Sequence, residues 1–161
     1  MKTLRITLLL YLLTTLLSCT GDPLAKMPDF KMVLPDNGGI VFTETLPGTG
    51  PVMFVHFDPD CKGCQEEAAL IKEKIDDFSK TRIYFLSLTN WDDIRYFRDY
   101  FKLNEHDNVF FGRDTDTTLA RHFKTATTPL IALYDKNKNL RAVIEGSSDL
   151  KKLMTTIKEI Q

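Results

Sequence analysis

The sequence predicts an α/β domain with a mixed central sheet, and three observations lead to that prediction. Short apolar runs typical of strands alternate with segments in which apolar residues recur every three to four positions. The run at 82–88 is nearly continuous in apolar residues, as in a strand that is covered on both faces. The last two runs, 130–134 and 140–145, are separated only by the turn at 135–139, so the chain ends in a hairpin and a helix.

The first half of the chain predicts a hairpin, a strand and a helix. Two short strands at 29–34 and 39–46 flank a turn with the sequence Pro35-Asp36-Asn37-Gly38-Gly39. A buried strand follows at 52–57. The next helix runs to about Lys80 and has an apolar face made of Ala68, Ile71, Ile75 and Phe78.

The second half continues the alternation after the strand at 82–88. Asn90 is the expected N-cap of a helix whose apolar face carries Ile94, Phe97 and Phe101. A short strand at 109–111 and a helix at 114–123, capped by Asp114 or Asp116, precede the hairpin. The final helix has Leu150, Leu153, Met154, Ile157 and Ile160 on one face.

Length and charge restrict the class of protein. The chain has 161 residues and a formal net charge of −1, which fits one globular domain. It contains no basic run and no basic face with interleaved aromatic residues, so nothing in it points to nucleic acid as a partner.

The first 18 residues are typical of a targeting segment. Lys2 and Arg5 precede an apolar stretch, Leu8 to Leu17, that is too short for a comfortable membrane span. The following Leu16-Leu17-Ser18-Cys19 resembles a bacterial lipobox, in which the cysteine is lipidated and becomes the new N-terminus. We therefore expect a signal peptide at 1–18, a lipidated Cys19 with a tether at 19–28, and a folded domain at 29–161. The alternative is a plain secretory signal with an incidental cysteine. Either reading places the domain outside the cytoplasm, where disulfides persist.

The chemistry is expected at Cys61 and Cys64, which lie where a strand ends and a helix begins. The first turn of a helix has free N–H groups and a positive dipole end, and both stabilise a thiolate. The second cysteine lies one turn on, within reach of a mixed disulfide on the first. A zinc ribbon would need a second such pair or two histidines, and the remaining cysteine is Cys19.

The order of strand, Cys-x-x-Cys, helix, strand, helix, then Thr-Pro before a hairpin and a last helix resembles the thioredoxin fold. The N-terminal hairpin and the lipobox resemble the extracytoplasmic TlpA/ResA-like thiol:disulfide oxidoreductases. The resemblance covers 29–161 and implies a thioredoxin-like fold: a mixed central sheet flanked by helices, with an N-terminal β-hairpin extension. It implies that Cys61 is the exposed nucleophile and Cys64 the resolving cysteine of a redox-active disulfide. It also implies that Pro129 is cis and that Thr128 offers its backbone to a bound peptide.

Glu67 lies three residues after Cys64, on the apolar face of the predicted helix. A desolvated carboxylate there would suit proton transfer with Cys64, and the TlpA/ResA-like branch has a glutamate at the matching position. The alternative is an exposed glutamate in the first turns, where the helix dipole favours it. The chain departs from thioredoxin at Val55, where thioredoxin has a buried aspartate, so a proton relay would use Glu67, His56 or water. It departs again at Asp60 and Lys62, whose charges act on the nearby thiolate in opposite directions.

Two other functions share this fold. A copper-delivery or other metal-binding protein would use His56 with Cys61 and Cys64. A peroxiredoxin-like thiol peroxidase would have Thr-x-x-Cys at its active cysteine, where this chain has Asp58, although the run from Phe57 to Cys61 keeps some likeness. A non-enzymatic binding module is the third alternative.

The sequence favours a thiol:disulfide oxidoreductase that is lipid-anchored through Cys19 in a bacterial cell envelope and faces the periplasm. Its expected partners are protein thiols and disulfides and a membrane redox protein. No cofactor is expected, because the two cysteines hold the electrons. The direction of electron flow is left open.

Overall fold

The computed structural model describes residues 22, 24–37, 39–147 and 150–161. The predicted signal peptide at 1–18 and the lipidated Cys19 lie outside the described residues, as does part of the predicted tether. Within the described ranges, no helix has the length and apolar character needed to cross a membrane.

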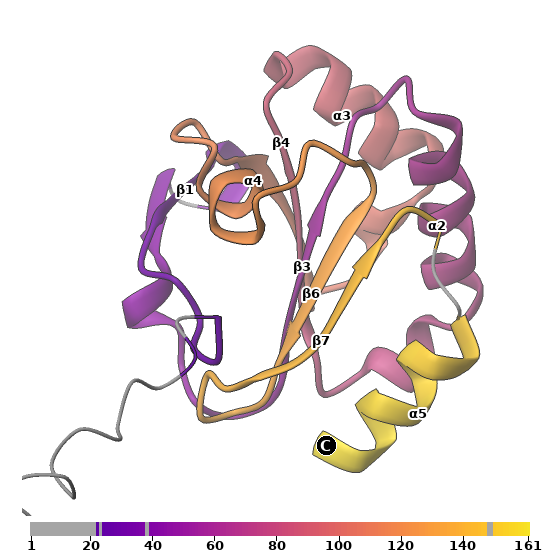
Figure 1. The fold of residues 1–161 in the computed structure, drawn as a ribbon. Coiled ribbons are helices and arrows are strands. Elements are labelled where there is room, and N and C mark those ends of the chain that lie inside the picture. Colours follow the sequence, from indigo (N-terminus) through magenta and orange to yellow (C-terminus); the bar gives the residue numbers. More distant parts are fainter. Residues whose placement is uncertain (1–21, 23, 38, 148–149) are drawn as a thin grey trace, which may run out of the picture.

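One mixed sheet forms the centre of the described chain (Figure 1). Its seven strands lie in the order β2-β1-β5-β4-β3-β6-β7. The central strand β3 is parallel to β4 and antiparallel to β6. The strands are β1 (Lys31–Leu34), β2 (Gly39–Phe42), β3 (Val52–His56), β4 (Arg82–Ser87), β5 (Val109–Arg113), β6 (Leu130–Tyr134) and β7 (Leu140–Glu145).

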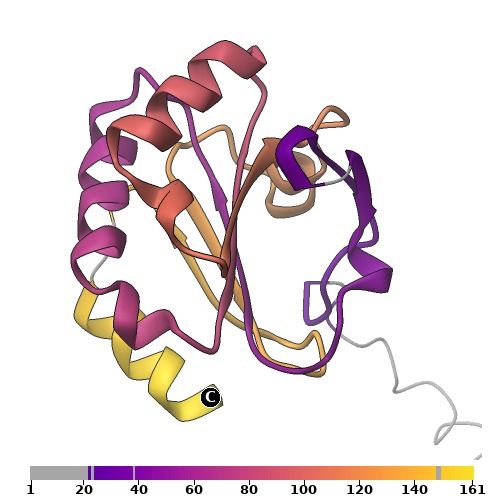
Figure 2. The same ribbon diagram turned by 180° about the vertical axis from the view of Figure 1, so that it is seen from behind.

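The helices divide between the two faces of the sheet (Figures 1 and 2). Three of them, α2 (Lys62–Glu73), α3 (Trp91–Tyr100) and α5 (Leu150–Ile160), lie on one side. The short helix α4 (Thr118–Phe123) and the β1–β2 hairpin lie on the other. Each face has its own apolar core, because alternate residues of a strand point to opposite sides. Along β3, Met53 and Val55 face the three helices, while Val52 and Phe54 face α4 and the hairpin.

The predicted N-terminal hairpin is confirmed, and it extends the sheet. Strand β1 pairs with β2 in antiparallel register and reaches β5 through Val33 and Arg113. Gly112 makes this close approach possible. A Cβ atom at Gly112 would lie 2.3 Å from Cδ2 of Leu34 and 2.5 Å from the carbonyl oxygen of Val33.

Several element boundaries differ from the sequence prediction. Strand β2 ends at Phe42, and Thr43–Thr45 forms a 3₁₀ turn instead of continuing the strand. Buried Thr43 ends the strand there, because its hydroxyl accepts from the N–H of Phe30 and donates to the carbonyl of Pro28. The helix predicted to reach Lys80 ends at Glu73 and is followed by a 3₁₀ turn at Ile75–Phe78.

The helix predicted at 114–123 begins only at Thr118, and its N-cap is Thr117 rather than Asp114 or Asp116. Asp114 nevertheless acts on the helix start, since its Oδ2 accepts from the N–H of Leu119 at 2.8 Å. Asn90 is the N-cap of α3 as predicted, and its Oδ1 accepts from the N–H of Asp93 at 3.0 Å.

Candidate active site

Cys61 and Cys64 lie at the junction of β3 and α2, as the sequence predicted. Cys61 is the N-cap of α2, and its Sγ accepts from the backbone N–H of Cys64 at 3.3 Å. Both thiols are free. Cys61 is partly exposed, whereas Cys64 is 1% exposed and belongs to the core under the helices. A partner molecule can therefore reach the first sulfur but not the second.

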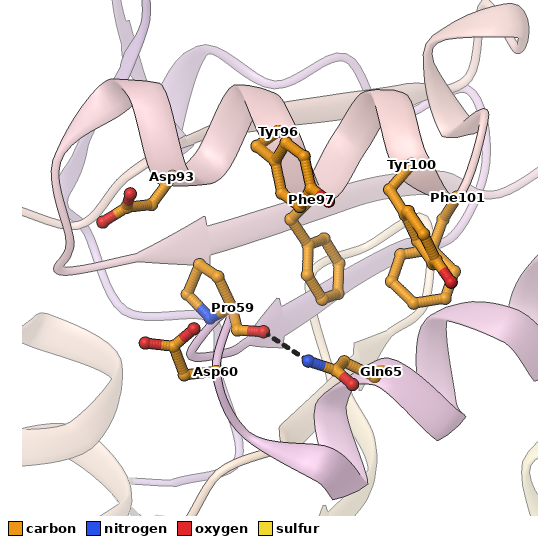
Figure 3. A pocket seen from close by; sticks show the side chains of 8 residues that line it. All are labelled: Pro59, Asp60, Gln65, Asp93, Tyr96, Phe97, Tyr100 and Phe101. Atoms are coloured by element: carbon orange, nitrogen blue, oxygen red, sulfur yellow. Dashed lines mark hydrogen bonds between the residues drawn. The ribbon is translucent and has the colours of Figure 1, made fainter.

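The loop before Cys61 is fixed by three hydrogen bonds. The carbonyl of Asp58 accepts from the N–H of Cys61 at 3.1 Å, and its Oδ1 accepts from the N–H of Asp60 at 2.9 Å. Gln65 of α2 donates from Nε2 to the carbonyl of Pro59 at 2.9 Å (Figure 3). The position of the Cys61 sulfur is thus set by both the loop and the helix.

The segment before β6 lies against the cysteine pair. The Thr128–Pro129 peptide bond is cis, as the resemblance implied, and Pro129 is buried. The Cys61 thiol donates to the carbonyl oxygen of Thr128 at 3.5 Å. Gly63 packs closely against the same segment, since a Cβ there would lie 3.4 Å from Cδ of Pro129 and 3.3 Å from Oγ of Ser147. Gly63 was not singled out from the sequence, because its role depends on a segment more than sixty residues away.

The surroundings separate the two thiols in acidity. Burial acts to raise the pKa of Cys61, but hydrogen bonds from the side chains of Cys64 and Thr128 and from the backbone N–H groups of Cys64 and Gly63 outweigh it. The pKa of Cys61 therefore lies below its ordinary value. Burial, together with the hydrogen bond to Cys61, raises the pKa of Cys64 to about 12. At neutral pH the exposed sulfur is the better nucleophile, and the buried one keeps its proton.

Glu67 lies one turn after Cys64 and is 1% exposed. Its neighbours on the inner face of α2 are Ala68 and Ile71, both fully buried. The alternative of an exposed glutamate in the first turns is therefore wrong. The structure places a carboxyl group on the same buried helix face as the resolving thiol.

His56 does not join the cysteines. It is 5% exposed and, by the alternation along β3, it shares a face with Phe54 rather than with Val55. Burial lowers its pKa, and the nearby charges of Asp114 and Asp58 only partly oppose this. Within the described ranges, no group of three or more His, Cys, Asp or Glu side chains has a geometry that would hold a metal ion.

A hollow next to the cysteine loop was not predicted from the sequence. It has a volume of about 360 Å³ and lies between the loop and α2 on one side and α3 on the other (Figure 3). Tyr96 and Tyr100 of α3 border it, and they are 73% and 68% exposed. The sequence gave no sign that these two residues face the loop of Cys61.

Comparison with known proteins identifies the fold of this chain. No protein-family model matches this chain, and no curated protein matches it. Solved structures do resemble it. DsbF from Mycobacterium tuberculosis is 19% identical with a TM-score of 0.70, over 88% of this chain and 100% of that chain. A Chlorobium tepidum protein described as thiol:disulfide interchange protein DsbE is 17% identical with a TM-score of 0.70, over 86% of this chain and 97% of that chain.

A third similar structure is peroxidoxin BcpB from Mycobacterium tuberculosis, 17% identical with a TM-score of 0.69, over 88% of this chain and 97% of that chain. Oxidoreductases and a peroxidase thus share one backbone arrangement, and at this identity the likeness speaks for the fold. The strand order, the cysteine pair at the start of α2 and the cis proline before β6 agree with it. This chain has a thioredoxin-like fold, extended at its N-terminus by a β-hairpin.

Proposed function

We propose that this protein is a thiol:disulfide oxidoreductase that exchanges disulfides with protein substrates. The observation that carries the proposal is the contrast between the two sulfurs. Cys61 is accessible at the start of α2 and has a lowered pKa, while Cys64 is buried behind it with a pKa of about 12. This contrast suits a two-step exchange in which one sulfur meets the partner and the other finishes the reaction.

In the first step, the Cys61 thiolate attacks a sulfur of the substrate disulfide. A Cys61–substrate S–S bond forms, the substrate S–S bond breaks, and the leaving sulfur takes up the electron pair and a proton. In the second step, Cys64 loses its proton and attacks Sγ of Cys61. The Cys61–Cys64 disulfide forms and the second substrate thiol leaves, so two electrons pass from the cysteine pair to the substrate. An oxidised pair runs the same steps in reverse.

Two further roles belong to this proposal. Glu67 takes the proton of Cys64 in the second step, which its burial on the same face of α2 supports. Thr128 binds the extended substrate through its backbone beside Pro129. The contact between the Cys61 thiol and the Thr128 carbonyl supports this, because it puts that backbone at the reacting sulfur.

The cellular setting is part of the proposal. The signal at 1–18 and a lipidated Cys19 would anchor the domain in a bacterial cell envelope, facing the periplasm, where a membrane redox partner renews the cysteine pair. One of the structures with this fold is described as a secreted disulfide oxidoreductase of Mycobacterium tuberculosis. Mass spectrometry of the mature N-terminus checks the anchor, and an unmodified Cys19 would count against it.

The peroxidase alternative has one observation in its favour, the likeness to peroxidoxin BcpB. The site itself fits exchange better. Asp58 stands three residues before Cys61, and its carboxylate oxygen accepts from the N–H of Asp60 within the loop. A carboxylate at this place disfavours a peroxide-derived anion by like charge.

Trapping of the mixed disulfide tests the proposal. The purified reduced protein is mixed with a protein that contains a disulfide, quenched with acid and analysed on non-reducing gels. The Cys64→Ser variant is expected to accumulate a covalent complex, because its first step proceeds and its second does not. The Cys61→Ser variant, which keeps the buried thiol, is the matched control and is expected to form none.

The reduction potential of the pair then shows the direction of electron flow. Equilibration in glutathione or dithiothreitol buffers, followed by thiol trapping, is expected to show one disulfide between Cys61 and Cys64. A potential near −270 mV, roughly that of thioredoxin, indicates a reductase, and one near −120 mV, roughly that of DsbA, indicates a disulfide donor. If no such disulfide forms and Cys64→Ser traps nothing, the exchange mechanism is wrong. Turnover of hydrogen peroxide would then favour the peroxidase.

A further inference from the structure

The hollow between the cysteine loop and α3 is built from three kinds of side chain. Its aromatic part comes from α3, where Tyr96 and Tyr100 stack with ring centroids 6.2 Å apart. Its polar part comes from Asp60 of the loop and Asp93 of α3, which lie toward the same end in Figure 3. Gln65 closes the side nearest to α2 and holds the loop through its hydrogen bond to Pro59.

The tyrosines are unusual in their exposure. Large apolar residues of α3 such as Ile94 and Phe97 are at most 3% exposed, as expected for a helix packed on a sheet. Tyr96 and Tyr100 are spaced four residues apart, so both lie along one line of the helix, away from Ile94. The fold itself does not cover these two exposed rings, which together we call the platform.

The two carboxylates of the hollow lack a basic partner. Among the described residues, no ion pair involves Asp60 or Asp93. The basic side chains nearest to them in sequence form ion pairs with other carboxylates: Lys62 pairs with Glu66, and Arg95 pairs with Asp92. Asp93 does accept a hydrogen bond from the amide of Asn90, which fixes its position without neutralising it. The hollow therefore offers negative charge that a cation from outside can meet.

The hollow borders the loop that carries Cys61. Asp60 directly precedes Cys61, and Pro59 lines the hollow while its carbonyl is held from α2. A polypeptide whose cysteine is bonded to Cys61 brings the residues that flank this cysteine close to the loop, and so close to the hollow that the loop borders. Aromatic faces beside carboxylates are the surroundings that a lysine or arginine side chain prefers, because the ring attracts the cation and the carboxylate pairs with it. The same helix already contains a contact of this kind: Cζ of Arg95 lies over the ring of Trp91, 5.9 Å from the ring centroid.

We infer that the hollow selects substrate segments that carry a lysine or arginine next to the reactive cysteine. The basic side chain lies on the platform of Tyr96 and Tyr100, and its charged end meets Asp60 and Asp93. This inference rests on the proposed exchange function and names the class of protein that it serves. A segment with an acidic residue at the same place is disfavoured by like charge.

The test measures a ratio of rates. Short peptides carry one cysteine in a mixed disulfide with thionitrobenzoate and have arginine, norleucine or glutamate on both sides of the cysteine. The reduced protein attacks the peptide sulfur, the peptide–thionitrobenzoate bond breaks, and the coloured thiolate leaves. Cys64 then releases the peptide thiol, and the enzyme pair supplies both electrons. We expect the arginine peptide to react about tenfold faster than the norleucine peptide at low salt, and the advantage to shrink at high salt.

Variants at the hollow locate the source of the preference. Tyr96→Ser and Asp93→Asn are each expected to lower the arginine-to-norleucine ratio by about threefold, since each removes one contact to the cation. Asp76→Asn is the matched control: it makes the same charge change at an exposed carboxylate outside the hollow and is expected to leave the ratio unchanged. Tyr100→Ser serves as a second platform variant if Tyr96→Ser is poorly folded.

Each outcome is decisive. Equal rates for the three peptides, or faster reaction of the glutamate peptide, overturn the inference, as does a preference that survives in Tyr96→Ser/Asp93→Asn. Hydroxyethyl disulfide, a small uncharged substrate, distinguishes failure of this inference from failure of the proposed exchange function. If the wild-type protein reduces it but shows no peptide preference, only the inference fails. If the protein reduces neither it nor any peptide, the proposed function fails first.

Discussion

At the scale of single residues, the site depends on the different surroundings of two sulfurs one turn apart. Cys61 loses its proton more readily than an ordinary thiol, because its pKa is lowered. Cys64 loses its proton far less readily, because burial raises its pKa to about 12. The second step of the exchange therefore needs a base within the core, and Glu67 is the buried carboxyl group on that face of α2.

The Glu67→Gln variant is expected to release a mixed disulfide about 100-fold more slowly than the wild type, with formation of the mixed disulfide unaffected. Quenched-flow measurement of its decay between weakly acidic and alkaline pH checks this. Release by the variant should rise only toward the pKa of Cys64, whereas release by the wild type should be fast near neutral pH. Glu66→Gln, an exposed neighbour, is the control. Wild-type release and an unchanged pH profile in Glu67→Gln would remove Glu67 from the mechanism.

The residues of the site differ in how far the sequence could predict them. The role of the cysteine pair follows from local order alone, since a strand, Cys-x-x-Cys and a helix are consecutive. The burial of Glu67 does not, because residue 67 lies at the border of the apolar face and the packing of the sheet decides its side. The exposure of Tyr96 and Tyr100 toward the Cys61 loop depends on how α3 is placed against a segment thirty residues earlier.

At the scale of elements, the succession of strands and helices along the chain was predictable and the ends of the elements were not. Apolar periodicity indicates where a strand or helix exists, but it does not show which contact ends that strand or helix. Strand β2 stops where Thr43 bonds to Phe30 and Pro28, thirteen and fifteen residues back in the chain. The N-cap of α3 was predictable because Asn90 and its partner Asp93 are three residues apart.

The junction of the hairpin with the sheet gives a test at this scale. Gly112→Ala is expected to lower the free energy of unfolding by about 1–3 kcal/mol, because the added methyl group collides with Leu34 and with the carbonyl of Val33. Urea unfolding at an unchanged m-value measures this. In the double variant Gly112→Ala/Leu34→Ala, the combined loss should be smaller than the sum of the two single losses. Strict additivity would show that the methyl group and Leu34 do not meet.

At the scale of the whole molecule, buried His56 and half-buried His122 link stability to pH. Burial lowers the pKa of His56, opposed by Asp114, by a backbone contact to Leu86 and by Asp58, and burial also lowers the pKa of His122. A histidine whose folded pKa lies below its unfolded value of 6.5 binds more protons when unfolded. Its stabilising contribution is complete above about 6.5 and is lost as the pH falls through the folded pKa.

We therefore expect the free energy of unfolding to fall between pH 7 and pH 5, and to fall less in His56→Gln, which carries no titrating ring. Urea titrations of both proteins at the two pH values measure the difference. If the free energy of unfolding of His56→Gln falls as steeply between pH 7 and pH 5 as that of the wild type, the buried ring of His56 does not cause the loss of stability in acid.

The capping of α2 by Cys61 links the electron chemistry to the helix itself. A thiolate is a strong acceptor for the N–H of Cys64, and a sulfur in a disulfide is a weak one, so oxidation weakens the start of the helix. This contact by itself stabilises the reduced form of the folded protein relative to its oxidised form. Any change that improves the fit of that N–H to the sulfur makes the pair a stronger oxidant, which makes the redox poise partly a property of helix folding.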